Sequence, residues 1–274
     1  FIHLLYLAFS LFVAEKQPMT QLHSEVFDGD SGLLILLHGL GATFDVWSPV
    51  VAARPESFTG RIIVMDLPGH GASEHLDDYG IKEVAKCIVD TLHRKIENLQ
   101  RCVLLGHSYG GVLALELMHS RWELNPQSVF GLGIKTLWTR EELARMNYLA
   151  EKIPKRFSSE QGAIEWYQKT TGLAGITGGS ANFARHGVRQ SADGQWMLAL
   201  DAKVNKISEP DMDRLMSHST CPVSLAYGAH DHMVDTADLR RYDPDVRNLA
   251  GGGHNIMVTH PEVIWTWMQS CWQN

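Results

Sequence analysis

Ser108 has the residue type and the surroundings of a catalytic nucleophile. It lies at the centre of the motif GHSYGG, residues 106–111, with the apolar run Cys102 to Leu105 before it and the apolar run Val112 to Leu115 after it. If a strand turns directly into a helix here, the turn leaves room only for glycine at the flanking positions of G-x-S-x-G. The hydroxyl then projects above the strand ends, next to the free N–H groups of the helix N-terminus. The motif therefore predicts a serine placed for nucleophilic attack.

The elements that must position this serine are predicted from short apolar runs that alternate with longer helical periods. Each run is followed by a Gly-rich or polar turn, and the runs occupy residues 33–37, 62–65, 102–105, 129–134 and 223–227. Because continuous apolar strands are buried on both faces, the runs indicate the α/β class, with a mostly parallel central sheet flanked by helices. Helices are expected at 81–99, where apolar residues recur every three or four positions, and at 261–272.

Composition and charge limit the class of protein. Hydrophobic residues make up 45% of the 274 residues and charged residues 20%, which is typical of a folded globular chain. The net charge of -7 comes from 24 basic and 31 acidic residues without a long block of either sign, so neither nucleic acid nor an anionic membrane is expected as a partner. The four cysteines lack C-x-x-C spacing and are interpreted as free thiols.

The first eighteen residues have a composition of their own. They begin with FIHLLYLAFSLFVA, an apolar stretch shorter than the about 20 residues of a spanning helix, without a basic region or an A-x-A cleavage site. Met19 begins a segment, MTQLHSEVFDG, that is typical of the start of an ordinary soluble protein. Residues 1–18 are therefore interpreted as an extension outside the fold, and no stable membrane insertion is expected. The apolar stretch leaves secretion or membrane association as alternatives to a cytoplasmic location.

Four further segments join GHSYGG in a set of five motifs. They are LLHGLG at 36–41, DLPGHGAS at 66–73, YGAHDHMV at 227–234 and GGGHNIMVTHPE at 251–262. With these motifs in this order, the chain resembles the alpha/beta-hydrolase superfamily over about residues 20 to 272. The resemblance implies a cofactor-free hydrolase whose serine, acid and histidine follow one another along the chain in that order.

The resemblance implies a catalytic role for three residues. Ser108 is the nucleophile, His254 takes its proton and delivers it to the leaving group, and Asp231 fixes the tautomer of the imidazole. Asp235 and Asp238 are alternatives for the acid, but they lie further beyond the apolar run that ends at 227.

The family pattern also implies two backbone donors for the oxyanion that forms during acyl transfer. They are the N–H groups of Leu40, in the loop after the first apolar run, and of Tyr109, directly after the nucleophile. His38, His70 and His107 each lie beside a glycine inside these motifs. They are interpreted as hydrogen-bonding residues of the loops and not as catalytic groups.

Neither a metal nor a dinucleotide is expected as a cofactor. His230 and His232 flank Asp231, but no cluster of cysteines or histidines accompanies them to complete a metal site. Gly39 and Gly41 form a G-x-G, yet the third glycine and the following helix of the dinucleotide motif are absent from the sequence.

More residues lie between the run that ends near Thr136 and the run that begins at Val223 than one crossover connection needs. Within them, TREELARMNYLAEKI and SEQGAIEWYQKTT have the residue pattern of helices. We therefore predict an inserted helical cap, a lid over residues 137–186, on a core formed by 19–136 and 187–274.

The lid is the predicted source of substrate contacts. Trp138, Met146 and Trp166 are candidates to line the pocket, although each of them has packing within the lid as an alternative role. Arg185 and Arg189 lie where the lid rejoins the core, and either could hold a substrate carboxylate or form a structural ion pair.

The leading hypothesis is an esterase that acts on a small to medium hydrophobic acyl or aryl ester through an acyl-enzyme. One alternative is an enzyme with the same catalytic residues that acts on another type of bond, such as a carbon-carbon hydrolase, a lactonase, a thioesterase or a perhydrolase. Another is a ligand-binding receptor on the same fold. A haloalkane dehalogenase is not favoured, because it needs a carboxylate where this chain has Ser108. The expected partner is a small-molecule substrate, and the sequence gives no prediction of oligomeric state.

Overall fold

The structure is a computed structural model that describes residues 20–272 apart from 98, 100, 177–180 and 218. The predicted extension at residues 1–18 lies outside the described residues. Among the helices of the described part of the chain, none combines the length and the apolar character that crossing a membrane requires.

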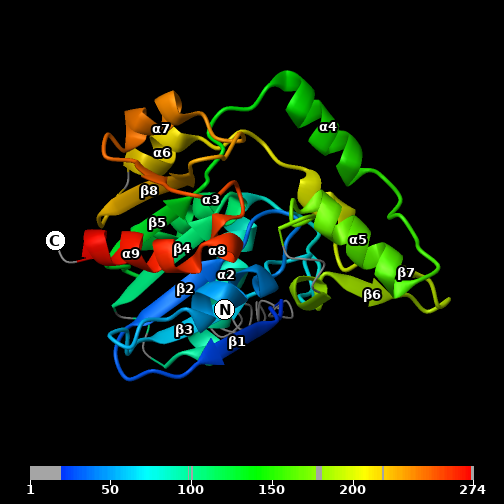
Figure 1. Ribbon diagram of the computed structural model, residues 1–274, viewed down its shortest axis with the longest axis horizontal. Helices are drawn as coiled ribbons and strands as arrows, with labels where there is room; N and C mark the ends of the chain where they lie inside the picture. The colour runs from blue at the N-terminus through cyan, green and yellow to red at the C-terminus, as the bar shows by residue number, and fades with distance from the viewer. Residues whose placement is uncertain (1–19, 98, 100, 177–180, 218, 273–274) are drawn as a thin grey trace, which may run out of the picture.

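A seven-stranded sheet forms the centre of the fold, with its strands in the order β1-β3-β2-β4-β5-β8-β9 (Figure 1). The strands are β1 (Ser24–Phe27), β2 (Leu33–Leu37), β3 (Arg61–Met65), β4 (Cys102–His107), β5 (Ser128–Leu132), β8 (Val223–Gly228) and β9 (Arg247–Leu249). β1 pairs with β3 in the antiparallel sense, and the other neighbouring strands pair in parallel. β2, β4 and β5 are buried along their whole length, as continuous apolar runs predict. This sheet confirms the predicted α/β class.

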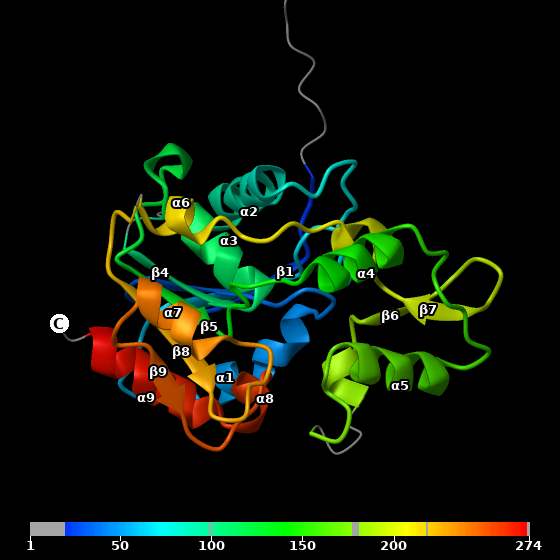
Figure 2. The ribbon, with the colours of Figure 1, turned by 90° about the horizontal axis from the view of Figure 1, so that it is seen from above.

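Helices cover both faces of the sheet, and each face has its own apolar core (Figure 2). One face carries α2 (Ile81–Lys95), α3 (Tyr109–Leu117) and α6 (Met212–Ser217), and the other carries α1 (Ser48–Ala52), α8 (Ile256–Thr259) and α9 (Pro261–Trp272). The short elements η1 (Phe44–Trp47), η2 (Ser120–Trp122), η4 (Ala202–Asn205) and α7 (Thr236–Tyr242) lie in the connections. Ile88 and Leu113 are buried in the first core, and Val50 and Trp265 in the second. Both faces of the sheet are therefore closed to water.

Two predicted elements end earlier than expected. The helix predicted over 81–99 ends at Lys95, because Ile96 has an extended backbone with φ of -127°. Its apolar spacing nevertheless continues, since Ile96 and Leu99 are 4% and 8% exposed and still pack into the core. The run predicted as a strand over 129–134 ends at Leu132, where Gly133 follows with φ of +63°. In both cases the apolar pattern correctly predicted which residues are buried, but it did not predict the residue at which the helix or strand ends.

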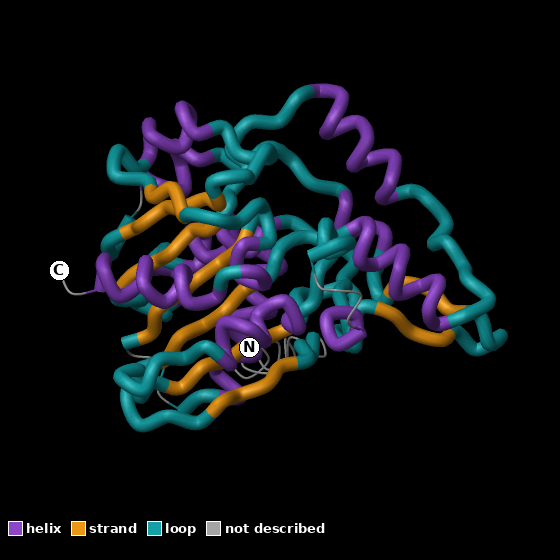
Figure 3. The backbone as a smooth tube through the Cα atoms, in the orientation of Figure 1, coloured by secondary structure: helices purple, strands orange, loops and turns teal. Residues whose placement is uncertain are grey.

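Between β5 and β8 the chain forms an insert, which we define as residues 137–200. It contains α4 (Arg140–Ala150), α5 (Glu160–Thr170), η3 (Ala181–Ala184), β6 (Val188–Gln190) and β7 (Trp196–Leu198). α4 and α5 lie beyond the strand ends and outside the layers that cover the sheet (Figures 1 and 3). Thr139 and Glu142 form a capping box that begins α4, and Ser159 caps α5. The hairpin of β6 and β7 follows the predicted lid and packs against α5.

The turn from β4 into α3 brings backbone groups too close together for side chains. A methyl group on Gly106 would lie 2.1 Å from the carbonyl oxygen of Gly110, and one on Gly110 would lie 2.3 Å from that of Leu37. Ser108, between the two glycines, has φ of +52° and ψ of -116°, a conformation that residues with side chains rarely adopt. The packing of α3 against the ends of β4 and β2 therefore holds Ser108 in a strained conformation.

Gly110→Ala is expected to destabilise the fold by about 2 to 4 kcal/mol, because the methyl group forces α3 away from β2. The midpoint of thermal unfolding should fall by about 5 to 15 °C. Gly80→Ala is the matched control, since its methyl group meets only Asp78 at 3.5 Å, an ordinary contact. A loss of thermal stability in Gly110→Ala no larger than that in Gly80→Ala would contradict the analysis of the turn.

Candidate active site

Ser108 is held by its backbone, while its hydroxyl is left without a partner. Its N–H donates to the carbonyl oxygen of Leu132 at 2.8 Å, and its own carbonyl oxygen accepts the N–H of Gly111 at 2.9 Å. Within the described residues no hydrogen bond engages the hydroxyl, and the residue is half-buried. The serine oxygen is therefore free to meet a bound molecule at the carboxyl end of β4.

Asp231 and His254 form the contact predicted for the acid and the base. Nδ1 of His254 lies 2.8 Å from one carboxylate oxygen of Asp231, and the other oxygen accepts the N–H of Met233 at 2.9 Å. The Asp231 side chain is fully buried. A carboxylate at Nδ1 keeps the proton on that nitrogen, so Nε2 carries a lone pair and can act as a base.

The two alternative carboxylates are engaged elsewhere. Asp235 caps α7 by accepting the N–H of Asp238 at 2.9 Å. Asp238 pairs with Arg241 on the same helix, with 2.6 Å between the charged groups. Among these three candidate carboxylates, the structure therefore brings Asp231 to the imidazole of His254.

His107 connects the serine to the histidine. It directly precedes Ser108, and its ring centroid lies 4.5 Å from that of His254. Its Nε2–H donates to the carbonyl oxygen of His254 at 2.8 Å. Burial, together with the neighbouring His254, holds the pKa of His107 well below that of an ordinary histidine. His107 is therefore a neutral donor that fixes the backbone of the candidate base beside the candidate nucleophile.

The loop that carries Leu40 and the first residue of α3, Tyr109, both lie next to this serine. A methyl group on Gly39 would lie 3.2 Å from Cβ of Ser108, so the loop that carries Leu40 passes directly over the turn. The N–H of Tyr109 is the first of α3. Within the described part of the chain, no acceptor engages the N–H of Leu40 or that of Tyr109. Both groups are available to a negative oxygen that forms near Ser108.

His38 and His70 tie this loop to the loop after β3. Nε2 of His38 accepts the N–H of Leu67 at 2.9 Å, and Nε2 of His70 accepts the N–H of Gly41 at 3.0 Å. The Nδ1–H of each ring donates to a backbone carbonyl one or two residues away. Burial lowers the pKa of both residues, that of His70 to about 3. Both histidines are therefore neutral, as their role as backbone acceptors requires.

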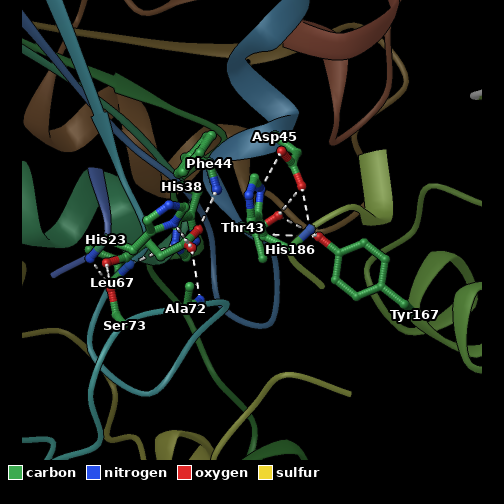
Figure 4. Close-up of polar contacts among 11 residues, drawn as sticks. His23, His38, Thr43, Phe44, Asp45, Leu67, Ala72, Ser73, Tyr167 and His186 are labelled. Carbon is green, nitrogen blue, oxygen red and sulfur yellow. Dashed lines mark hydrogen bonds and ion pairs between the residues drawn. The ribbon is translucent and has the colours of Figure 1, made fainter. Parts of the chain in front are cut away.

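Asp66 is a buried carboxylate whose role the sequence did not indicate. It accepts the N–H groups of Phe44 at 2.9 Å and Ala72 at 3.1 Å, and its second oxygen lies 3.0 Å from Nδ1 of His23 (Figure 4). Burial alone would raise its pKa, but the hydrogen bond from His23 and the backbone donors lower it. A charged Asp66 thus fixes both loops beneath the site.

The three residues predicted to contact the substrate lie in the insert, and each of their side chains is half-buried. Trp138 is half-buried and donates from its indole N–H to the carbonyl oxygen of Lys135 at 3.2 Å. Met146 is half-buried on α4. Trp166 has Nζ of Lys155 4.0 Å from its ring centroid, which is a packing contact within the insert. A pocket-lining role for these residues stays a prediction.

The two arginines near the end of the predicted lid and the two histidines that flank Asp231 are exposed. Arg185 and Arg189 are exposed, and within the described residues neither takes part in an ion pair. His230 and His232 are exposed as well. No group of three histidine, cysteine or acidic side chains in the described part of the chain is placed to hold a metal ion.

Comparisons with known proteins identify the family of this chain. A model described as the alpha/beta hydrolase family matches residues 34–266, a range that contains Ser108, Asp231 and His254. The chain is 27% identical to a 2-succinyl-6-hydroxy-2,4-cyclohexadiene-1-carboxylate synthase of Pectobacterium atrosepticum, over 83% of this chain and 88% of the relative. It is 25% identical to a pimeloyl (acyl-carrier protein) methyl ester esterase of Aeromonas hydrophila, over 84% of this chain and 91% of the relative.

A likeness in fold is found among solved structures. The structure of an E-2-(acetamidomethylene)succinate hydrolase superposes with a TM-score of 0.74 at 20% identity, over 93% of this chain and 96% of that chain. At this identity the likeness concerns the fold alone.

The three buried histidines, His38, His70 and His107, are expected to make stability depend on pH. Each has a lower pKa in the folded protein than the value of 6.5 expected for the unfolded chain. Below about pH 6.5 the unfolded chain therefore binds more protons, and the free energy of unfolding falls as the pH drops. His70→Gln should reduce this slope by up to about 1.4 kcal/mol per pH unit between about pH 6 and pH 4.

Urea unfolding at a series of pH values measures this slope. The control is His93→Gln, which replaces an exposed histidine of α2 and should leave the slope unchanged. An identical slope in His70→Gln and in the wild type would contradict the neutral state assigned to His70.

Proposed function

Since the chain belongs to the alpha/beta hydrolase family, we propose that it is a serine hydrolase that cleaves carboxylic esters through an acyl-enzyme. The observation that carries the proposal is the pair formed by Asp231 and His254, with 2.8 Å between carboxylate and imidazole, beside a serine whose hydroxyl is free. Family membership supports hydrolase activity in general, and these side chains support the serine mechanism.

The proposed reaction begins with attack of the Ser108 oxygen on the ester carbonyl carbon. Nε2 of His254 takes the hydroxyl proton, and Asp231 stabilises the imidazolium that forms. The carbonyl oxygen becomes negative between the N–H groups of Leu40 and Tyr109, which stabilise it. When the tetrahedral intermediate collapses, His254 gives its proton to the leaving alkoxide. A water molecule then repeats the sequence on the acyl group bound to Ser108 and restores the free serine.

The proposed substrate is a small to medium hydrophobic acyl or aryl ester. Half-buried Trp138 and Met146 of the insert are proposed to contact its apolar part. The similar protein of Aeromonas hydrophila is named an esterase of a methyl ester, which supports the proposed type of bond.

Ser108→Ala is expected to abolish labelling by a fluorophosphonate probe and to lower kcat for p-nitrophenyl esters by about 10⁵- to 10⁶-fold. Asp231→Asn should lower kcat by about 10⁴-fold, because the histidine loses its correct tautomer. Ser120→Ala replaces an exposed serine of η2 and serves as the control with full activity. Labelling that persists in Ser108→Ala would contradict the assignment of the nucleophile. A wild type that is neither labelled nor active on any ester would favour the ligand-binding receptor.

A second candidate function is hydrolysis of a substrate that carries a carboxylate, with an ester or a carbon-carbon bond as the bond cleaved. Arg185 and Arg189 favour it, because both are exposed and, among the described residues, no acidic side chain neutralises them. The name of the similar protein of Pectobacterium atrosepticum, a carboxylate synthase, also contains such an acid. A guanidinium can hold a carboxylate through two parallel hydrogen bonds.

Arg189→Ala is therefore expected to raise KM for a p-nitrophenyl hemisuccinate by about 10-fold and to leave KM for the neutral butyrate unchanged. Steady-state kinetics on the two esters measure the difference. Arg247→Ala, at an exposed residue of β9, is the control for a general loss of positive charge. Equal changes for the charged and the neutral ester would exclude a carboxylate-binding role for Arg189.

A further inference from the structure

Tyr167 of α5 reaches from the insert to the loop that carries the proposed oxyanion donor Leu40. Its hydroxyl accepts the backbone N–H of Thr43 at 3.1 Å and lies 3.2 Å from the Thr43 hydroxyl (Figure 4). Tyr167 is 1% exposed and Thr43 is also 1% exposed, so no water can replace this contact.

Asp45 makes a second connection between the same two segments. One of its carboxylate oxygens lies 2.9 Å from Nδ1 of His186, and the other accepts the backbone N–H of His186 at 3.0 Å. The second oxygen also accepts the hydroxyl proton of Thr43 at 3.1 Å. Thr43 and Asp45 on the loop, with Tyr167 and His186 on the insert, thus form one buried network, which we call the clasp.

The loop is held by the core on its other side. Gly41 donates its N–H to His70, and Phe44 donates its N–H to Asp66. The intervening N–H of Thr43 is bonded to Tyr167 of the insert. The N–H of Ala42 bonds within the loop, to the carbonyl oxygen of Gly39 at 3.2 Å. The loop is therefore bonded to the core at Gly41 and Phe44 and to the insert at Thr43, so its position depends on both.

Aromatic packing adds to the clasp at the same place. The ring of His186 lies 4.9 Å from that of Phe44 and 4.8 Å from that of His23, measured between centroids. Phe44 and His23 are both partners of Asp66 in the core. The segment around His186 is thus joined to the core through rings as well as hydrogen bonds, whereas α4 has no fully buried residue.

We propose that Tyr167 and His186 are positioning residues, which fix the N–H of Leu40 by docking the insert onto the oxyanion loop. The inference rests on the proposed function, in which that N–H stabilises the transition state. Donors of this kind act only within a few tenths of an ångström of their correct position. Loss of the clasp should therefore reduce the stabilisation of the transition state, while the affinity for the substrate stays the same.

Tyr167→Phe tests the inference by removing one hydroxyl. We expect kcat for a p-nitrophenyl ester to fall about 10- to 100-fold, with KM unchanged within about twofold. The matched control is Tyr148→Phe, which removes an exposed hydroxyl from α4 of the same insert, where Tyr148 is 57% exposed. Equal kcat values in Tyr167→Phe and Tyr148→Phe, or a rise in KM alone, would overturn the inference.

A thionoester provides a readout that a purely structural role would not change. Sulfur in place of the carbonyl oxygen is a poorer acceptor, so the ratio of ester to thionoester turnover reports the strength of the oxyanion contacts. This ratio should fall in Tyr167→Phe and stay at the wild-type value in Tyr148→Phe. An unchanged ratio in both variants would overturn the inference even if kcat had fallen.

His186 supplies a second test if Tyr167→Phe folds poorly. His186→Ala removes the ring donor to Asp45 and should reduce both kcat and the ratio, whereas His186→Asn keeps an N–H near the position of Nδ1 and should restore part of each. Failure of His186→Asn to act better than His186→Ala would overturn the role given to this hydrogen bond.

Amide hydrogen exchange separates the clasp from the proposed function. In Tyr167→Phe, exchange at Thr43 and also at Gly41 should become faster, although the acceptor of Gly41 is His70 of the core. If the wild type hydrolyses no ester, the proposed function fails, and this measurement alone decides on the clasp. Exchange at Gly41 as slow as in Tyr148→Phe would overturn the coupling between insert and loop.

Discussion

Close contact between the backbones of β2, β4 and α3 is the constraint on which the site depends. Because no side chain fits at Gly106 or Gly110, α3 begins directly above the strand ends and Ser108 is held with φ of +52°. Such a conformation costs about 1 to 3 kcal/mol, and the packing of α3 into a buried core offsets that cost. This conformation leaves the hydroxyl of Ser108 without a hydrogen-bond partner in the described chain. It also places Ser108 beside the free N–H groups at the start of α3.

The loop after β2, which carries Leu40 and Thr43, is held in place by hydrogen bonds to other parts of the chain. Neutral His70 and charged Asp66 hold it from the core, and the clasp holds it from the insert. Burial keeps His70 neutral, whereas the hydrogen bonds that Asp66 accepts keep its carboxylate charged against the effect of burial. The loop that carries the proposed oxyanion donor is therefore bonded to both the core and the insert.

The fold was predictable where the hydrophobic pattern was strong. β2, β3, β4 and β8 lie within a residue or two of the apolar runs that predicted them, because strands buried on both faces leave a continuous signal. β1 and β9 were missed, since their residues are mostly exposed or half-buried at the edges of the sheet. The hairpin of β6 and β7 was missed as well, because strands of three residues carry too little pattern to be recognised.

The sequence by itself determined which residues have the chemistry of a catalytic site. It also determined the apolar strands at whose ends these residues lie. It placed Ser108 at a strand-to-helix turn, and it favoured Asp231 as the acid, with Asp235 and Asp238 as alternatives. Only the tertiary structure decided that Asp231 meets His254. Only the tertiary structure joined Asp45 to His186, which lie 141 positions apart in the sequence. The physical reason is that a hydrogen bond acts over about 3 Å in space, and separation along the chain says nothing about that distance until the sheet and the insert have packed.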